Sequence, residues 1–259
     1  MTQPLVSCLT ATYGRHTLVE QVLSCFLNQD YDDAELVILN NHPEPLFVSS
    51  IVRDHHSLTV RVVNESGYKT LGACRNRLLE LAQGEFVRTW DDDDLYLPWT
   101  LSQGMSLIGD APAFKPARSW FTTDMSKFEL QRNVFEAAML VRTDVARKYG
   151  YKESGGDEHM PLLEGIAKEG GCREIEMGWQ SSYIYRWGCG VWHISGSLGS
   201  NQTVEERTKV WVEKHNDTGG GSPLQYLSMY ETWVRLTESA VLEGYDKLML
   251  RRALLGRVR

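Results

Sequence analysis

Short apolar runs and amphipathic segments alternate along the first ninety residues. The runs at 5–11 and 35–39 have the length of buried strands, whereas apolar residues between 18 and 27 recur at the three- and four-residue spacing of a helix. The predicted elements in this part are strands over 5–11, 35–39, 57–63 and 85–90 and helices over 18–27 and 74–82. Strands that alternate with helices are typical of βαβ units, so we expect an α/β fold with a mainly parallel central sheet flanked by helices.

The remaining sequence is less regular. It predicts strands over 134–141 and 182–187, helices over 143–148 and 159–168, and a largely helical stretch from residue 204 onward. Glycine-rich residues 218–223 interrupt that last stretch and indicate a flexible connection or the edge of a lid. We therefore expect one α/β domain over 1–203 and a helical C-terminal extension over 204–259.

Composition narrows the class of protein. The 259 residues are 42% hydrophobic and 24% charged, which is typical of a globular protein and excludes a collagenous or disordered chain. No apolar run approaches the ~18 residues of a membrane span, and the N-terminus lacks the features of a signal peptide, so we expect a cytoplasmic protein. Five scattered cysteines encode neither a disulfide framework nor a structural zinc site. The net charge of −7 argues against a surface that binds nucleic acid throughout, although it permits a local basic groove.

Four consecutive aspartates, Asp91 to Asp94, follow the predicted strand over 85–90. Four adjacent carboxylates repel one another and call for a cation, and an extended backbone would place Asp91 and Asp93 on one side. Mg²⁺ and Mn²⁺ prefer such oxygen ligands, and open α/β sheets bind ligands beyond the carboxyl ends of their strands. The alternative is a solvated acidic turn, which Pro98 would also permit.

Several segments occur in an order that resembles family 2 glycosyltransferases of the GT-A fold. In the first hundred residues they are 10–15, 36–41, 72–76 and 84–94 followed by Pro98, and further on they are 136–142, Gly150-Tyr151 and an acidic pair. The resemblance implies a Rossmann-like GT-A domain, with a nucleotide-sugar-binding half over 1–98 and an acceptor-binding half over 99–203. It also implies a nucleotide-sugar donor, a divalent metal (Mn²⁺ or Mg²⁺) on the diphosphate, and transfer with inversion at the anomeric carbon.

The resemblance assigns roles to particular residues. Those expected to bind the nucleotide sugar are Thr10, Thr12, Tyr13, Arg15, Asn41, Arg75, Asn76, Asp91, Asp92 and Arg186. The expected metal ligands are Asp93 and His193. The alternative for the threonines and Arg15 is a structural role, in which they stabilise a turn or cap a helix. The alternative for His193 is a core histidine whose hydrogen bonds are made within the protein.

One departure concerns the nucleobase. In this family the second strand usually ends in an acidic residue that reads the base edge, but Asn40-Asn41 stands here instead. An amide offers a donor as well as an acceptor, so the base preference can differ, although uridine remains the favoured base.

Inverting transfer needs a carboxylate that removes the proton of the acceptor hydroxyl. Asp157 and Glu158 resemble the family's acidic pair, and we expect Asp157 to be the base with Glu158 the second candidate. This sequence differs from the family at Pro161, because a proline stands where the family usually continues a helix. The alternative is that these acids only interact with the dipole of the following helix.

The acceptor side is less defined. Trp99, Trp120 and Phe121 flank the region where an acceptor would approach, and the acceptor can be a glycan, a lipid-linked sugar, a protein or a modified base in DNA. Arginines at 251, 252, 257 and 259 give the last helix a basic face, which indicates peripheral contact with an anionic membrane or nucleic acid, or packing on its own domain.

Two other classes of protein remain open. A nucleotidyltransferase that makes nucleotide sugars would carry a glycine-rich basic loop after the first strand, whereas residues 11–16 contain one glycine and one arginine. A non-catalytic nucleotide-sugar-binding module would keep the fold and lose the acids, whereas the four aspartates and the acidic pair are present.

Overall fold

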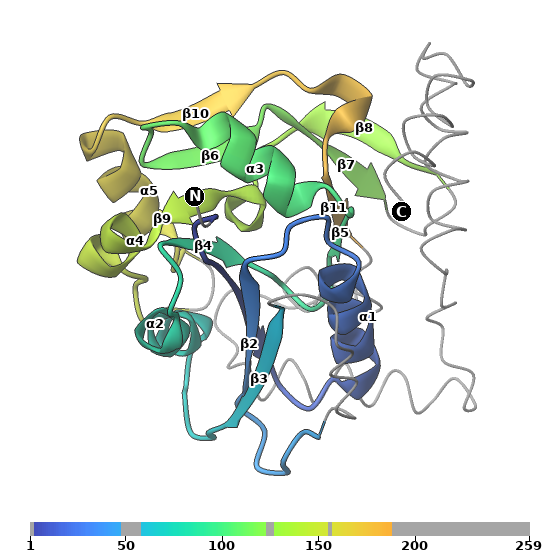
Figure 1. Cartoon of the computed structure of the whole chain (residues 1–259). Coiled ribbons are helices and arrows are strands. Elements are labelled where there is room, and N and C mark those ends of the chain that lie inside the picture. The colour runs from blue at the N-terminus through green and yellow to red at the C-terminus, as the bar shows by residue number, and fades with distance from the viewer. Residues whose placement is uncertain (1–2, 48–57, 123–126, 155–156, 188–259) are drawn as a thin grey trace.

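The computed structural model describes residues 3–47, 58–122, 127–154 and 157–187 (Figure 1). The predicted C-terminal extension over 204–259, its basic last helix, the glycine-rich segment and His193 lie outside the described residues.

A seven-stranded sheet forms the centre of the molecule, in the order β10-β6-β9-β4-β1-β2-β3. Its parallel half consists of β1 (Val6–Thr12), β2 (Ala34–Asn40), β3 (Thr59–Asn64) and β4 (Phe86–Thr89). The four strands match the four predicted in the first ninety residues. Their carboxyl ends lie along one edge of the sheet, and the aspartate run follows β4 at that edge.

The other half of the sheet is mixed. β9 (Leu140–Arg142) runs antiparallel between β4 and β6 (Ala113–Pro116), and β10 (Cys172–Ile175) pairs in parallel with β6. The predicted α/β fold with a mainly parallel central sheet is confirmed, although β6 and β10 were not predicted.

Helices cover both faces of this sheet, as α1 and α2 do on either side of β1 to β3 in Figure 1. The helices are α1 (His16–Leu27), α2 (Leu71–Leu81), α3 (Thr100–Ile108), α4 (Thr143–Tyr149) and α5 (Met160–Lys168). Alternate residues of a strand point to opposite faces, so Cys8 and Ile38 pack with α1 and α3, whereas Leu9 and Val37 pack with α2, α4 and α5. The strands are therefore apolar on both faces, as parallel strands between helices must be.

A second sheet of four strands lies beside the aspartate run, in the order β5-β11-β7-β8. Its strands are β5 (Leu95–Tyr96), β7 (Arg118–Thr122), β8 (Glu129–Arg132) and β11 (Tyr183–Arg186). β5 directly follows the aspartates and pairs antiparallel with β11. This pairing fixes the path of the chain directly after the aspartate run.

The predicted strand over 134–141 is wrong over most of its length. The chain forms a turn of 3₁₀-helix, η1 (Glu136–Ala138), before β9. Glu136 begins this turn, and its buried carboxylate accepts hydrogen bonds from Thr89 (2.8 Å), Tyr151 (2.7 Å) and Arg75 (3.0 Å). These partners come from β4, α2 and the segment after α4, and such contacts are absent from the apolar pattern on which the strand prediction rests.

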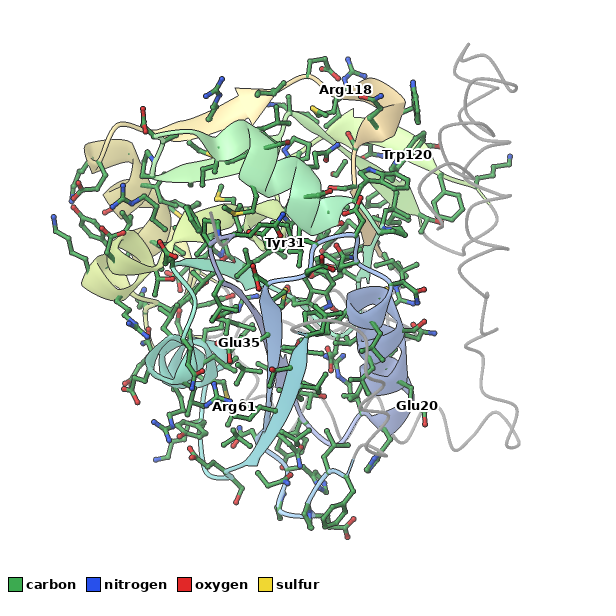
Figure 2. The ribbon with its side chains drawn as sticks, viewed as in Figure 1. Glu20, Tyr31, Glu35, Arg61, Arg118 and Trp120 are labelled. Carbon is green, nitrogen blue, oxygen red and sulfur yellow. The ribbon has the colours of Figure 1, made fainter. Side chains whose placement is uncertain are left out.

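Side chains tie the strands together at the amino-terminal edge of the sheet, away from the aspartates. Glu35 on β2 and Arg61 on β3 point toward one another (Figure 2) and form an ion pair of 3.2 Å. Glu35 also accepts the hydroxyl of Ser7 on β1 at 2.6 Å. These contacts fix the register of three strands, so their opposite ends are held in place for the site.

Candidate active site

The four aspartates form a turn. The backbone N–H of Asp94 donates to the carbonyl of Asp91 at 3.4 Å, which is the bond of a β-turn, so the expected extended segment is wrong. The side chains of Asp91 and Asp93 keep 25% and 10% of their surface exposed, whereas that of Asp92 keeps 1% and Asp94 is 1% exposed as a residue. Asp91 and Asp93 are thus the two carboxylates of the run that solvent reaches.

Arg75 on α2 gathers three carboxylates from distant parts of the chain. Its Nη2 donates to both oxygens of Asp91 at 3.1 Å, and its Nη1 donates to Glu136 (3.0 Å) and Glu158 (3.1 Å). Burial opposes the charge of Arg75, but the three carboxylates outweigh it and raise the pKa of Arg75 well above its usual value. Asp91, Glu136 and Glu158 with Arg75 are called the Arg75 cluster below.

The Arg75 cluster depends on a close approach at Gly72. The helix α2 begins at Leu71 because the side chain of Thr70 accepts the N–H of Ala73 at 3.2 Å. A Cβ at Gly72 would lie 1.8 Å from the carbonyl oxygen of Lys152, so only glycine lets the first turn of α2 pack against the segment that carries Glu158.

We expect Gly72→Ala to lower the free energy of unfolding by about 1–3 kcal/mol, because backbone atoms must move apart to admit the methyl group. Urea unfolding followed by circular dichroism measures it. Glu80→Ala, exposed on the same helix, is the control and should change stability by less than about 0.5 kcal/mol. Equal stability of the two variants would contradict the close approach.

Arg15 and Thr12 hold the other side of the aspartate turn. Thr12 at the end of β1 donates its hydroxyl to Asp92 at 2.6 Å, and Arg15 forms ion pairs with Asp92 and, at 3.4 Å, with Asp93. Thr10 donates to the carbonyl of Trp90 at 2.7 Å and so positions the strand that leads into the turn. The loop after β1 thus lies against the aspartates.

The fourth aspartate connects the turn to the second sheet. Asp94 accepts hydrogen bonds from the hydroxyl of Tyr183 and, at 3.0 Å, from the backbone N–H of Arg186. Arg186 is 1% exposed, and its Nε and Nη1 donate to the carbonyl of Asp93 and to Gln21. Arg186, expected to pair with phosphate, is therefore held by the aspartate turn itself in the structure.

The two candidate bases have different surroundings. Asp157 is exposed and binds Lys152 (2.7 Å) and Ser154 (2.5 Å). Glu158 is 6% exposed and belongs to the Arg75 cluster, with His159 at 4.0 Å. Burial raises the pKa of Glu158, but His159 and Arg75 outweigh burial and hold it below its usual value, so Glu158 is ionised at neutral pH. The structure brings Glu158, and not Asp157, to the aspartates.

Two predicted nucleotide-binding amides are engaged within the protein. Asn76 donates to the carbonyl of Tyr151 at 2.8 Å and accepts its N–H at 2.8 Å. Asn41 makes the same pair of bonds with the backbone of Tyr68, at 2.7 and 3.0 Å. Tyr13, directly after β1, packs edge-to-face on His42 with 4.9 Å between ring centroids.

A divalent cation fits the charge of this site. Six carboxylates of this site lie beside three arginines that contact them in the described part of the chain, Arg15, Arg75 and Arg186. Burial, followed by repulsion from neighbouring carboxylates, raises the pKa of Asp92 to about 6 and that of Asp94 well above its usual value. Within the described residues no group of three His, Cys, Asp or Glu side chains is arranged to hold a metal. Asp91 and Asp93, as the two accessible carboxylates, would hold Mn²⁺ or Mg²⁺ together with waters and substrate phosphate, the usual pattern for Mg²⁺.

The structure corrects two expectations and adds two residues. Trp99 and Trp120 are 2% and 0% exposed, so these rings belong to the core and not to an acceptor surface, whereas Phe121 is half-buried. Glu136 and Tyr151 were not predicted as site residues. The signal for Glu136 was present, because a lone carboxylate interrupts an apolar segment.

This architecture is that of the GT-A glycosyltransferases. It matches TarS of S. aureus in complex with UDP with a TM-score of 0.54, at 16% identity, covering 98% of this chain and 88% of that one. It also matches the mannosyltransferase PcManGT of Pyrobaculum calidifontis, in complex with GDP-Man and Mn²⁺, with a TM-score of 0.53, at 15% identity, over 100% of this chain and 86% of that one.

The chain belongs to glycosyl transferase family 2, whose model matches residues 7–163, more than half of its length. A glycosyltransferase of Methanocaldococcus jannaschii is 22% identical over 176 residues, which cover 59% of this chain and 61% of that protein. A GalNAc(5)-diNAcBac-PP-undecaprenol beta-1,3-glucosyltransferase of Campylobacter jejuni is 28% identical over 113 residues, or 42% of this chain and 36% of that protein. The matched region thus spans about a third to three fifths of these relatives, and the predicted family is confirmed.

No helix in the described part of the chain is both long enough and apolar enough to cross a bilayer.

Proposed function

We propose that this protein is an inverting, metal-dependent glycosyltransferase that moves a sugar from a nucleoside-diphosphate sugar to a hydroxyl acceptor. The observation that carries the proposal is the Arg75 cluster, in which an ionised buried carboxylate, Glu158, shares one guanidinium with Asp91 of the aspartate turn. A candidate base, Glu158, and a candidate cation site, formed by the solvent-accessible Asp91 and Asp93, therefore lie close to the same arginine.

Each carboxylate has a distinct task in this proposal. Asp91 and Asp93 hold the divalent cation, which when bound supplies positive charge for the departing diphosphate. Glu158 accepts the proton of the acceptor hydroxyl while that oxygen bonds to the anomeric carbon and the bond from this carbon to the diphosphate oxygen breaks. The products are the glycosylated acceptor, a nucleoside diphosphate and a protonated Glu158.

Uridine diphosphate is the favoured carrier, and the acceptor is a hydroxyl of a glycan or of a hydroxylated nucleobase. The solved neighbours leave the carrier open, because one was solved with UDP and another with GDP-Man. We also propose a cytoplasmic location, because the proposed donor is a nucleotide sugar.

A thermal-shift experiment tests donor and metal together. UDP-, GDP-, CDP- and TDP-sugars are compared with and without Mn²⁺, and we expect one nucleotide series to raise the Tm only when Mn²⁺ is present. Asp93→Asn should abolish the metal-dependent part of the shift, because it removes one of the two accessible carboxylates. Asp110→Asn, an exposed aspartate away from the site, should retain it. If no donor gives a metal-dependent shift in the wild type, the proposed function is wrong.

A further inference from the structure

The end of β2 carries no carboxylate, and its two amides are occupied. The Oδ1 of Asn40 accepts the N–H groups of Gly14 (3.1 Å) and His42 (3.2 Å), and its Nδ2 donates to Glu44 (2.9 Å) and Asn64 (2.9 Å). All four hydrogen-bonding positions of this amide are filled, and Asn40 is 0% exposed. Asn40 therefore shapes the loops after β1 and β2 and has no group left for a ligand.

Asn41 is also committed. Its amide donates to and accepts from the backbone of Tyr68, and it is 4% exposed. This pair of bonds anchors the loop between β3 and α2, the loop that leads to Arg75. A base edge that approached β2 would have to displace a backbone peptide to reach Asn41.

His42 is the next polar side chain, and its ring is fixed from several sides. The ring packs edge-to-face on Tyr13, and its Nδ1 accepts the N–H of Glu44 at 3.1 Å. Gly14, with φ of +66°, passes so close that a Cβ there would lie 3.0 Å from the ring. The ring is nevertheless only half-buried. It is an ordered side chain at the ligand edge of the sheet, available to a bound molecule.

The contact at Nδ1 determines what His42 can offer. A neutral imidazole carries its proton on one nitrogen, so an Nδ1 that accepts a hydrogen bond leaves Nε2 as an N–H donor. No hydrogen bond within the described residues involves Nε2. The end of β2 thus presents a single donor where a carboxylate would present only acceptors.

The position of His42 fits one part of a nucleotide. In the central sheet β1 lies between β4 and β2, so the aspartate turn after β4 and His42 after β2 are two strand spacings apart, roughly 10 Å. A nucleotide whose diphosphate lies at Asp91 and Asp93 can span this separation and place its base at β2.

We propose that His42 is the base-reading residue of this enzyme, and that it donates its Nε2–H to a carbonyl oxygen or ring nitrogen of the nucleobase. This inference rests on the proposed function and makes the recognition of the nucleobase more specific. Where the family usually has a carboxylate that accepts hydrogen bonds from the base, this protein has the Nε2–H of His42, which donates one. Tyr13 supports the ring of His42 and keeps it in the orientation that the hydrogen bond needs.

Calorimetric titration in the presence of Mn²⁺ tests the assignment, with UDP, CDP, GDP and ADP as ligands and pyrophosphate as the probe without a base. For the diphosphate that the wild type binds best, His42→Ala should weaken binding roughly tenfold, the effect of one lost hydrogen bond, while pyrophosphate binding stays unchanged. His42→Gln restores an N–H near the position of Nε2 and should retain most of the affinity. His16→Ala, an exposed histidine on α1, should change neither ligand.

Three outcomes would overturn the assignment. They are nucleotide affinity within twofold of the wild type in His42→Ala, an equal loss for pyrophosphate, and equal losses in the alanine and glutamine variants. If the wild type binds pyrophosphate but no nucleoside diphosphate more tightly, the proposed function fails together with the inference. If a nucleotide binds and His42 does not matter, only the inference fails.

Discussion

Glu158→Gln is expected to lower kcat by about 10²–10⁴-fold, the contribution typical of a general base. Glutamine keeps the size of the side chain and can still accept a hydrogen bond from Arg75, but its amide does not take up the proton of the acceptor hydroxyl. Arg75 would retain Asp91 and Glu136 as charged partners, so the fold should be preserved. Initial rates of nucleoside diphosphate release and the Tm of the variant measure the two effects separately.

Asp157→Asn is the matched control. Asp157 is the neighbouring acid and the base that the sequence favours, but its side chain is exposed and paired with Lys152. An exposed ion pair contributes little to stability, and the variant should keep a rate within about threefold of the wild type. A large loss in Asp157→Asn together with an active Glu158→Gln would reverse the assignment and restore the expectation from sequence.

Arg75→Ala is expected to lower the free energy of unfolding by about 3–5 kcal/mol, because it leaves Asp91, Glu136 and Glu158 without their shared counter-charge. The side chains of Glu136 and Glu158 are only 6% and 7% exposed, so loss of the guanidinium leaves two charges with little solvent to stabilise them. Lysine should not restore stability, since one ammonium group does not reproduce the fork that reaches three carboxylates. Urea unfolding of both variants measures the loss.

Arg77→Ala is the control for position and charge. Arg77 lies on the same helix two residues further on and pairs with Glu65 and Glu80, but its side chain is 32% exposed. Removing an exposed pair should cost less than about 1 kcal/mol. If Arg75→Ala were as mild as Arg77→Ala, the carboxylates of the Arg75 cluster would have to be neutral in the folded protein.

Periodicity predicted the elements that are long and apolar on a regular face. The strands β1 to β4 lie close to their predicted positions, because parallel strands between helices are continuous apolar runs. The helices α1, α2, α4 and α5 also lie close to theirs, because their apolar residues recur at helical spacing. The short strands β6, β7, β8 and β10 and the helix α3 were not predicted. Each of these short strands depends on a partner from another part of the chain: β6 pairs with β9 and β10, and β7 pairs with β8 and β11.

The site was predictable in part for the same reason. The loop after β1 and the aspartate run follow neighbouring parallel strands, so topology alone places Thr12 and Arg15 against Asp92. The choice between Asp157 and Glu158 was not predictable, because adjacent residues differ only in the direction that their side chains take. Glu136 and His42 were missed for different reasons. Glu136 lies in a segment that carries the family resemblance, but its three partners come from other elements. His42 lies just beyond the segment 36–41.

The sequence by itself determined the family, the order of the βαβ units and the run of carboxylates at the end of β4, because these are properties of contiguous residues. The tertiary structure decided which of Asp157 and Glu158 Arg75 holds, that the amides of Asn40 and Asn41 are occupied within the protein, and that the ring of His42 packs on Tyr13. Each of these depends on atoms from segments that are far apart in sequence and meet only when the sheet and helices pack. Local pattern contains no information about such hydrogen-bond partners, and the partners determine what each polar side chain can still offer to a ligand.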